Sequence, residues 1–155
     1  MALPWTLTIV GALDRDAAAV TGLRAAIASS GLTGRVILAG TVDRAALEGL
    51  YAAADVFVIA SRYEGYGMAA AEAMARGIPL VASDGGALAA TIPDAAGVRF
   101  VAGDAVGLRG ALRRMVSDPV LRAGCAQGSW SAGLKLPRWE DTAGCIVRAL
   151  SSIGG

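Results

Sequence analysis

The chain has 155 residues, of which 55% are hydrophobic and 17% are charged, and its formal net charge is +1 at neutral pH. This composition predicts one folded globular domain and excludes an intrinsically disordered chain. The basic residues are scattered and only Lys135 is a lysine, so no basic face is available for tight nucleic-acid binding, although a small phosphate ligand is still allowed.

The chain contains no histidine, which excludes Ser-His-Asp and Cys-His mechanisms. Its two cysteines, Cys125 and Cys145, are too far apart for the usual Cys/His zinc sites. We interpret them as free, partly buried thiols in a reducing compartment. The apolar run Leu3–Leu13 has no basic start and stops at Asp14, so we expect neither a signal peptide nor a membrane span there.

Short apolar runs alternate along the chain with Ala- and Leu-rich helical runs. In chain order we predict strand Leu7–Val10, helix Asp16–Ser29, strand Val36–Ala39, helix Arg44–Ala53, strand Val56–Ala60, helix Met68–Arg76, strand Leu80–Ala82, strand Val98–Val101 and helices Ala105–Ser117, Pro119–Gln127 and Trp139–Ser152. The continuous apolar strands indicate burial on both faces. The alternation predicts an α/β fold: a Rossmann-like, doubly wound, mostly parallel sheet with helices on both faces.

One segment combines a strand end, a polar turn and a helix start. The turn, Ser61-Arg-Tyr-Glu-Gly-Tyr-Gly67, follows a predicted buried strand and precedes a predicted helix, which places it at the edge of the sheet where ligands bind. Free backbone N–H groups at a helix start favour an anion such as a diphosphate. Gly65 and Gly67 would let a ligand approach the backbone closely.

Two glutamates flank this turn and helix. Glu72 lies in the second helical turn, where its side chain leans toward the ligand edge and its carboxylate could accept hydrogen bonds from a ribose diol. Glu64 lies in the turn, where it could hold a sugar hydroxyl. The alternative is that Glu64 is an ordinary turn residue and Glu72 a solvated helix former, and the spacing of eight residues does not decide between them.

A resemblance adds to this interpretation. The turn Ser61–Gly67, with the run Glu72–Ser83, resembles the E-x7-E signature of retaining GT-B glycosyltransferases, in particular the large family that contains sucrose synthases and bacterial α-mannosyltransferases. The resemblance extends over about residues 7–150. Further landmarks of the family occur in the same order at Leu7–Gly11, Val36–Val42, Leu50–Val58, Gly85-Gly86 and Trp139–Ala143.

The resemblance implies how a UDP- or GDP-linked hexose would be bound. Glu72 would hold the ribose, and Val42 would lie in the loop near the base. The donor sugar and diphosphate would be held by Glu64 and the backbone of Gly65, Tyr66, Gly67 and Met68, with Ser61 and Arg62 in the same turn. No metal ion or other cofactor is expected. Arg62 has an equally good alternative as a solvated turn residue.

By the same resemblance, residues 1–155 would form a single C-terminal nucleotide-sugar-binding domain. It would lack the family's first strand and loop, which carry a diphosphate-clamping Arg and Lys, and the N-terminal acceptor domain. The catalytic residues therefore stay unassigned, because the acceptor side is absent, and we expect no turnover by the chain alone. The expected partners are that missing domain or a partner chain, or a second copy through the exposed inter-domain face. A cytoplasmic location is expected, with the full-length enzyme peripheral at the inner face of the membrane.

Several features depart from the family pattern or imitate another one. Ala89 stands where the family often has a Glu. The D-x-D spelled by Asp14-Arg-Asp16 resembles a metal-binding signature of another glycosyltransferase fold, but we interpret it as helix capping. We interpret Trp5, Trp130 and Trp139 as packing residues, with contact between the C-terminal aromatics and the missing domain as the alternative.

Two other functions stay open. The chain could be a non-catalytic nucleotide-binding or interaction module that requires a partner chain. It could also be a GT-B-fold epimerase or phosphorylase, which the absence of histidine and the single lysine disfavour.

Overall fold

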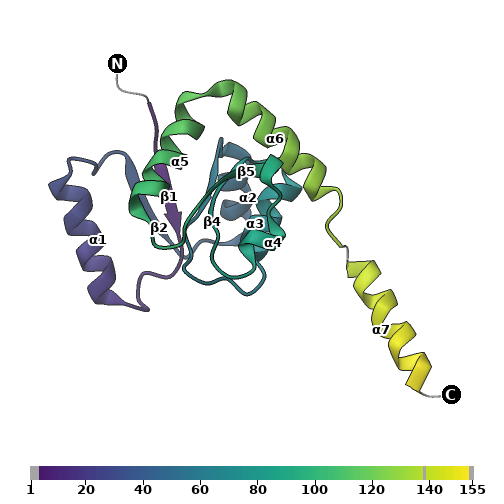
Figure 1. The fold of residues 1–155 in the computed structure, drawn as a ribbon. Coiled ribbons are helices and arrows are strands. Elements are labelled where there is room, and N and C mark those ends of the chain that lie inside the picture. Colours follow the sequence, from purple (N-terminus) through teal and green to yellow (C-terminus); the bar gives the residue numbers. More distant parts are fainter. Residues whose placement is uncertain (1–3, 138, 154–155) are drawn as a thin grey trace. The chain divides into compact units, whose positions relative to one another are not determined.

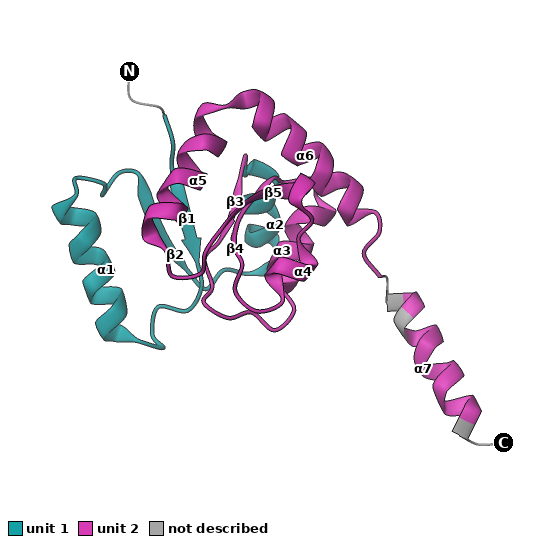
Figure 2. Cartoon of the chain, in the orientation of Figure 1, with its two compact units in different colours: residues 1–54 teal, residues 55–155 magenta. Residues whose placement is uncertain are grey.

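A computed structural model describes residues 4–137 and 139–153, and at positions 139, 142 and 153 it describes the backbone alone. The contacts divide the chain into two compact units, residues 1–54 and residues 55–155 (Figure 2). The sequence also predicts a frayed end at Gly154-Gly155, which lies outside the described residues.

The first unit is a parallel strand-helix-strand-helix segment. It comprises β1 (Leu7–Val10), α1 (Ala17–Ser29), β2 (Val36–Gly40) and α2 (Arg44–Ala53) (Figure 1). β1 and β2 pair in parallel, beginning with Leu7 opposite Val36, and the register shifts between Ile9 and Val10. The start of α2 is capped as the sequence predicts, because the Asp43 carboxylate accepts a hydrogen bond from the Ala46 amide at 2.8 Å.

The second unit contains a three-stranded parallel sheet in the order β3-β4-β5. Its elements are β3 (Phe57–Ile59), α3 (Met68–Ala75), β4 (Leu80–Ser83), α4 (Leu88–Thr91), the 3-10 turn η1 (Asp94–Ala96), β5 (Gly97–Phe100), α5 (Ala105–Ser117), α6 (Pro119–Gly133) and α7 (Trp139–Ile153) (Figure 1). Every strand pair in the described residues is parallel, which confirms the predicted α/β class.

The core of the second unit lies where α5 and α6 pack on the sheet. The buried cluster comprises Val81 from β4, Phe100 from β5, Ala111 and Met115 from α5, and Cys125 from α6. All four residues of β4 are buried, as expected for the central strand. The prediction that all strands are buried on both faces is wrong for β1, three of whose four residues are exposed. A two-stranded sheet has no interior strand, so β1 has a paired neighbour on one side only.

Helix α6 is longer than its predicted end at Gln127, and it continues to Gly133. The sequence underestimates it because Gly and Ser are poor helix formers. Tertiary contacts outweigh that weak propensity. A Cβ at Gly128 would overlap the Ala95 backbone, and one at Gly133 would overlap the Met74 backbone, so only glycine allows this close packing. Between them, the buried Ser129 hydroxyl lies 2.8 Å from the Ile78 carbonyl and 3.1 Å from that of Ala96.

Two tryptophans have mixed environments. The Trp5 ring stacks under the Arg35 guanidinium at 3.9 Å and is 36% exposed. Trp130 lies against Gly77 but is 49% exposed. The predicted packing role is therefore confirmed only in part, and the side chain of Trp139 lies outside the described residues. No helix in the described ranges is long and apolar enough to cross a membrane.

Candidate functional site

The predicted ligand-binding turn, Ser61–Gly67, lies in the turn 60–67 that connects the end of β3 to the start of α3. Because β3, β4 and β5 are parallel, this turn lies at the same edge of the sheet as the loops after β4 and β5. Gly67 is the N-cap of α3, with a φ of 88°, and no side chain caps the helix. This strand-turn-helix setting agrees with the sequence-based prediction.

Three backbone carbonyls of the turn accept hydrogen bonds from residues 83–91, which comprise the last residue of β4 and the segment that follows it. The Ser83 hydroxyl donates to the Ser61 carbonyl at 2.6 Å, and the Ala87 amide donates to the Glu64 carbonyl at 2.8 Å. The Thr91 hydroxyl donates to the third carbonyl, that of Tyr66, at 2.9 Å. Residues 83–91 thus hold the backbone of the turn in place.

The two consecutive glycines of that segment make this attachment possible. A Cβ at Gly85 would lie 2.6 Å from the carbonyl oxygens of Ser61 and Arg62. A Cβ at Gly86 would overlap the Glu64 carbonyl, and Gly86 also has a φ of 62°, which side chains rarely adopt. Gly85-Gly86 therefore lies directly on the backbone of the turn.

The side chains predicted to bind a ligand are mostly open to solvent. Arg62, Gly65 and Glu72 are exposed, while Ser61 and Glu64 are half-buried. The Glu64 carboxylate lies 3.5 Å from the Ser61 hydroxyl, at the limit of hydrogen bonding.

Two of the remaining predicted side chains flank Gly67. Tyr66 is 50% exposed and Met68 is 63% exposed. Val42, the last of the predicted residues, is half-buried. It belongs to the first unit, whereas the turn belongs to the second.

Glu72 has a free carboxylate within the described part of the chain. Arg76 donates to the Glu72 backbone carbonyl at 2.8 Å, and no hydrogen bond or ion pair of the described residues involves the carboxylate itself. The structure therefore leaves both interpretations of Glu72 open: a ligand for a diol, or a solvated helix residue.

The start of α3 carries unsatisfied backbone donors. Within residues 4–137 and 139–153 the amides of Gly67 and Met68 have no acceptor, although Gly67 itself is buried. Buried amides are normally paired, so an unpaired one at a helix N-terminus suits an anionic ligand.

Asp16 of the D-x-D segment caps a helix, as predicted. The Asp16 carboxylate accepts a hydrogen bond from the Ala19 amide at 2.9 Å, at the start of α1. The described residues contain no group of three or more acidic, Cys or His side chains that could hold a metal ion.

Sequence reasoning missed α4, η1 and the role of Thr91. Helix α4 has only four residues, too few for a periodic pattern. Ser83 could have been singled out from the sequence, because it is the last residue of the run Glu72–Ser83 on which the resemblance rests. Thr91 carried no such signal, because its bond to Tyr66 spans 25 positions.

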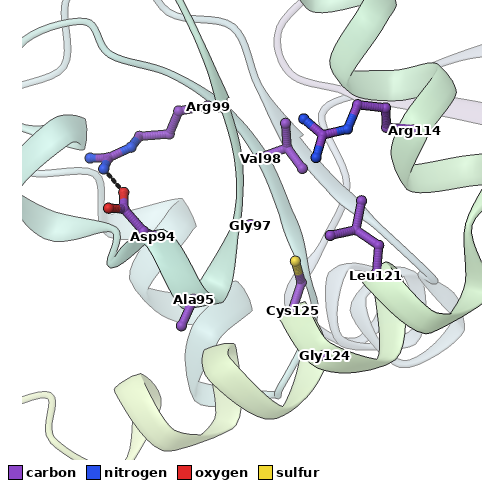
Figure 3. Close-up of a pocket in the computed structure, with 9 residues that line it drawn as sticks. All are labelled: Asp94, Ala95, Gly97, Val98, Arg99, Arg114, Leu121, Gly124 and Cys125. Carbon is purple, nitrogen blue, oxygen red and sulfur yellow. Dashed lines mark ion pairs between the residues drawn. The ribbon is translucent and has the colours of Figure 1, made fainter.

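A separate open pocket of about 530 Å³ lies beside β5 (Figure 3). It is lined by residues of η1, β5, α5 and α6 and contains an ion pair between Arg99 and Asp94. Arg99 also donates to the Ala89 carbonyl at 2.7 Å. The pocket includes Gly97, at the amino end of β5, whereas the turn 60–67 follows the carboxyl end of β3. It is therefore distinct from the predicted ligand edge.

Cys125 lines that pocket and is 5% exposed, while Cys145 in α7 is exposed, so the prediction of partial burial is wrong for Cys145. Its helix makes too few contacts with the rest of the unit to cover it. Burial raises the pKa of the Cys125 thiol, and the charge of Arg114 partly offsets this. Because the thiolate is the reactive form, Cys125 should be the less reactive cysteine.

We expect iodoacetamide at pH 7.5 to alkylate Cys145 rapidly in the folded chain and Cys125 far more slowly. Mass spectrometry of digested samples would locate the label, and unfolding in guanidinium should equalise the two rates. Equal labelling of both thiols in the folded chain would contradict the burial of Cys125.

We expect Gly86→Ala to destabilise the chain by about 1–3 kcal/mol, because alanine at positive φ is strained and its Cβ would displace the turn. Gly110→Ala is the matched control. Gly110 lies inside α5 with open space around it, so the change should stabilise by about 0.4–1 kcal/mol. Urea unfolding of both variants measures the difference. A Gly86→Ala variant as stable as Gly110→Ala would show that the turn does not depend on this contact.

Comparison with known proteins identifies a family. Residues 2–118 match the family model "Glycosyl transferases group 1". The chain is 31% identical over 142 residues to a D-inositol 3-phosphate glycosyltransferase of Xylanimonas cellulosilytica, a match that covers 91% of this chain and 34% of that protein. The chain thus spans about a third of the length of this curated relative.

Solved structures share the fold. The chain superposes on Anabaena Alr3699/HepE in complex with UDP with a TM-score of 0.85 and 26% identity, over 96% of this chain and 41% of that one. It also superposes on the C-terminal domain of a group 1 glycosyl transferase, LpcC, from Francisella tularensis, with a TM-score of 0.76 and 30% identity, over 83% of this chain and 67% of that one. The fold is therefore that of a GT-B-type domain, and the chain belongs to the glycosyl transferases group 1 family.

Proposed function

We propose that residues 1–155 act as one donor-binding domain of a retaining glycosyltransferase, and that this domain binds a nucleoside diphosphate sugar at the turn 60–67. The observation that carries the proposal is the pair of unpaired amides at Gly67 and Met68, at the start of a helix at the carboxyl edge of a parallel sheet. Membership of the family and the likeness to a UDP complex support it.

Four of the predicted residues have distinct roles in this proposal. The α3 N-terminus and the Gly67 and Met68 amides bind the diphosphate. The Glu72 carboxylate, exposed and without a partner in the described residues, accepts hydrogen bonds from the ribose hydroxyls. Glu64, half-buried beside the diphosphate position, binds a hydroxyl of the hexose. Val42 belongs to the first unit, and its place near the base stays a prediction.

The proposed chemistry is departure of the nucleoside diphosphate from the sugar with retention at the anomeric carbon. The negative charge that develops on the leaving diphosphate is stabilised by the fixed amides and the dipole of α3.

In this proposal no metal ion is needed to stabilise the charge of the diphosphate. Chelation of metal ions with EDTA should therefore leave donor binding unchanged.

Transfer also needs an acceptor held beside the donor, and positioning contributes several kcal/mol to such reactions. The chain spans 34% of the length of its glycosyltransferase relative, so we propose that the acceptor is bound by a partner domain or chain in the cytoplasm. The purified chain should then show no sustained transfer from UDP-glucose or GDP-mannose to a panel of sugar and inositol acceptors. Sustained transfer by the purified chain would contradict the proposal that another domain or chain binds the acceptor.

The binding function can be tested by calorimetric titration of the full chain with UDP, GDP and ADP. We expect UDP or GDP to bind, and Glu72→Gln to weaken that binding about 10-fold, because a hydrogen bond to a charged group is lost. Glu140→Gln is the control: it removes the same charge from an exposed position in α7 and should leave the affinity unchanged.

The outcomes separate the site from the function. If none of the three nucleotides binds, the proposed function is wrong. If one binds and Glu72→Gln matches Glu140→Gln, the ribose role of Glu72 is wrong and the solvated-residue interpretation holds.

A further inference from the structure

Thr91 forms a polar link between α4 and the proposed donor-binding turn. It is the last residue of α4, and its hydroxyl donates to the Tyr66 carbonyl at 2.9 Å. The Thr91 amide is bonded to the Ala87 carbonyl at 2.9 Å, and the Ala87 amide is bonded to the Glu64 carbonyl at 2.8 Å. The backbone of Thr91 is therefore bonded to Ala87, which is itself bonded to the turn.

The bond to Tyr66 determines the direction of a neighbouring donor. The Tyr66 carbonyl and the Gly67 N–H belong to the same planar trans peptide, so they point in opposite directions. When Thr91 holds the carbonyl on the α4 side, the Gly67 N–H must face away from α4. No acceptor binds this N–H within residues 4–137 and 139–153.

The local backbone does not enforce this orientation by itself. Gly67 has a φ of 88°, and glycine reaches several other backbone conformations at little cost, so the peptide before it can rotate. Packing limits movement on one side, because a Cβ at Gly67 would lie 2.9 Å from the buried Leu88 side chain. That apolar contact has no preferred peptide orientation, whereas the Thr91 hydrogen bond has one.

We propose that Thr91 is a positioning residue for donor binding. Its hydroxyl holds the Tyr66 carbonyl so that the Gly67 N–H faces the diphosphate of the nucleotide sugar. This inference rests on the proposed function, and it assigns a role to a residue outside the turn and outside the predicted ligand-binding residues. Thr91 itself does not contact the donor.

The test compares Thr91→Val, which keeps the shape of the side chain and removes the hydroxyl, with Thr91→Ser, which keeps the hydroxyl. The probes are UDP and uridine, or GDP and guanosine if GDP binds more tightly, in titrations followed by 1H–15N NMR. We expect Thr91→Val to weaken diphosphate binding by ~3- to 10-fold, which is the net effect of one hydrogen bond, and to leave nucleoside binding unchanged. Thr91→Ser should restore the wild-type affinity for the diphosphate.

The selective loss distinguishes positioning from a general structural role. The Gly67 amide signal should shift on diphosphate binding in wild type and in Thr91→Ser, and shift much less in Thr91→Val. If Thr91→Val weakens nucleoside and diphosphate binding equally, or leaves both unchanged, the inference is overturned while the proposed function stands. If the wild-type chain binds no nucleotide, both are overturned.

Discussion

The close backbone contact between Gly85-Gly86 and residues 61–64 is the constraint on which the candidate site depends. The turn 60–67 is mostly exposed and has few internal contacts, so its shape comes from residues 83–91. Ser83, Ala87 and Thr91 each donate to one of its carbonyls, and the two glycines let the backbones approach closely enough for these bonds to form. With those carbonyls turned toward residues 83–91, the Gly67 and Met68 amides are left unpaired at the start of α3.

The sheet of the second unit fixes the position of the segment that holds the turn. β4 is fully buried between β3 and β5, and the loop that leaves it carries the contacts to the turn. Asp84 ties the same loop to the end of β5, because its amide donates to the Phe100 carbonyl at 3.0 Å and its carboxylate accepts from the Ala102 amide at 2.7 Å. Loops after three parallel strands are thus joined at one edge of the sheet, where α/β folds bind ligands.

The sequence predicts much of this fold and only part of the site. Strand and helix positions follow from apolar runs and capping residues such as Asp43, because those signals are local. The length of α6 does not follow from local signals. Gly128 and Gly133 lower helix propensity, and they are favoured only by close packing on Ala95 and Met74. The turn is recognisable because its residues are contiguous. Thr91 is not recognisable in the sequence, because the carbonyl that it binds, that of Tyr66, lies 25 positions away along the chain.

The central claim is that the diphosphate of a nucleotide sugar binds at the start of α3. A crystal structure of the chain with UDP or GDP, whichever binds more tightly, tests it most directly. The account predicts diphosphate oxygens within hydrogen-bonding distance of the Gly67 and Met68 amides, with the ribose beside Glu72. A nucleotide bound elsewhere, such as in the pocket beside Cys125, with both amides still unpaired, would contradict it.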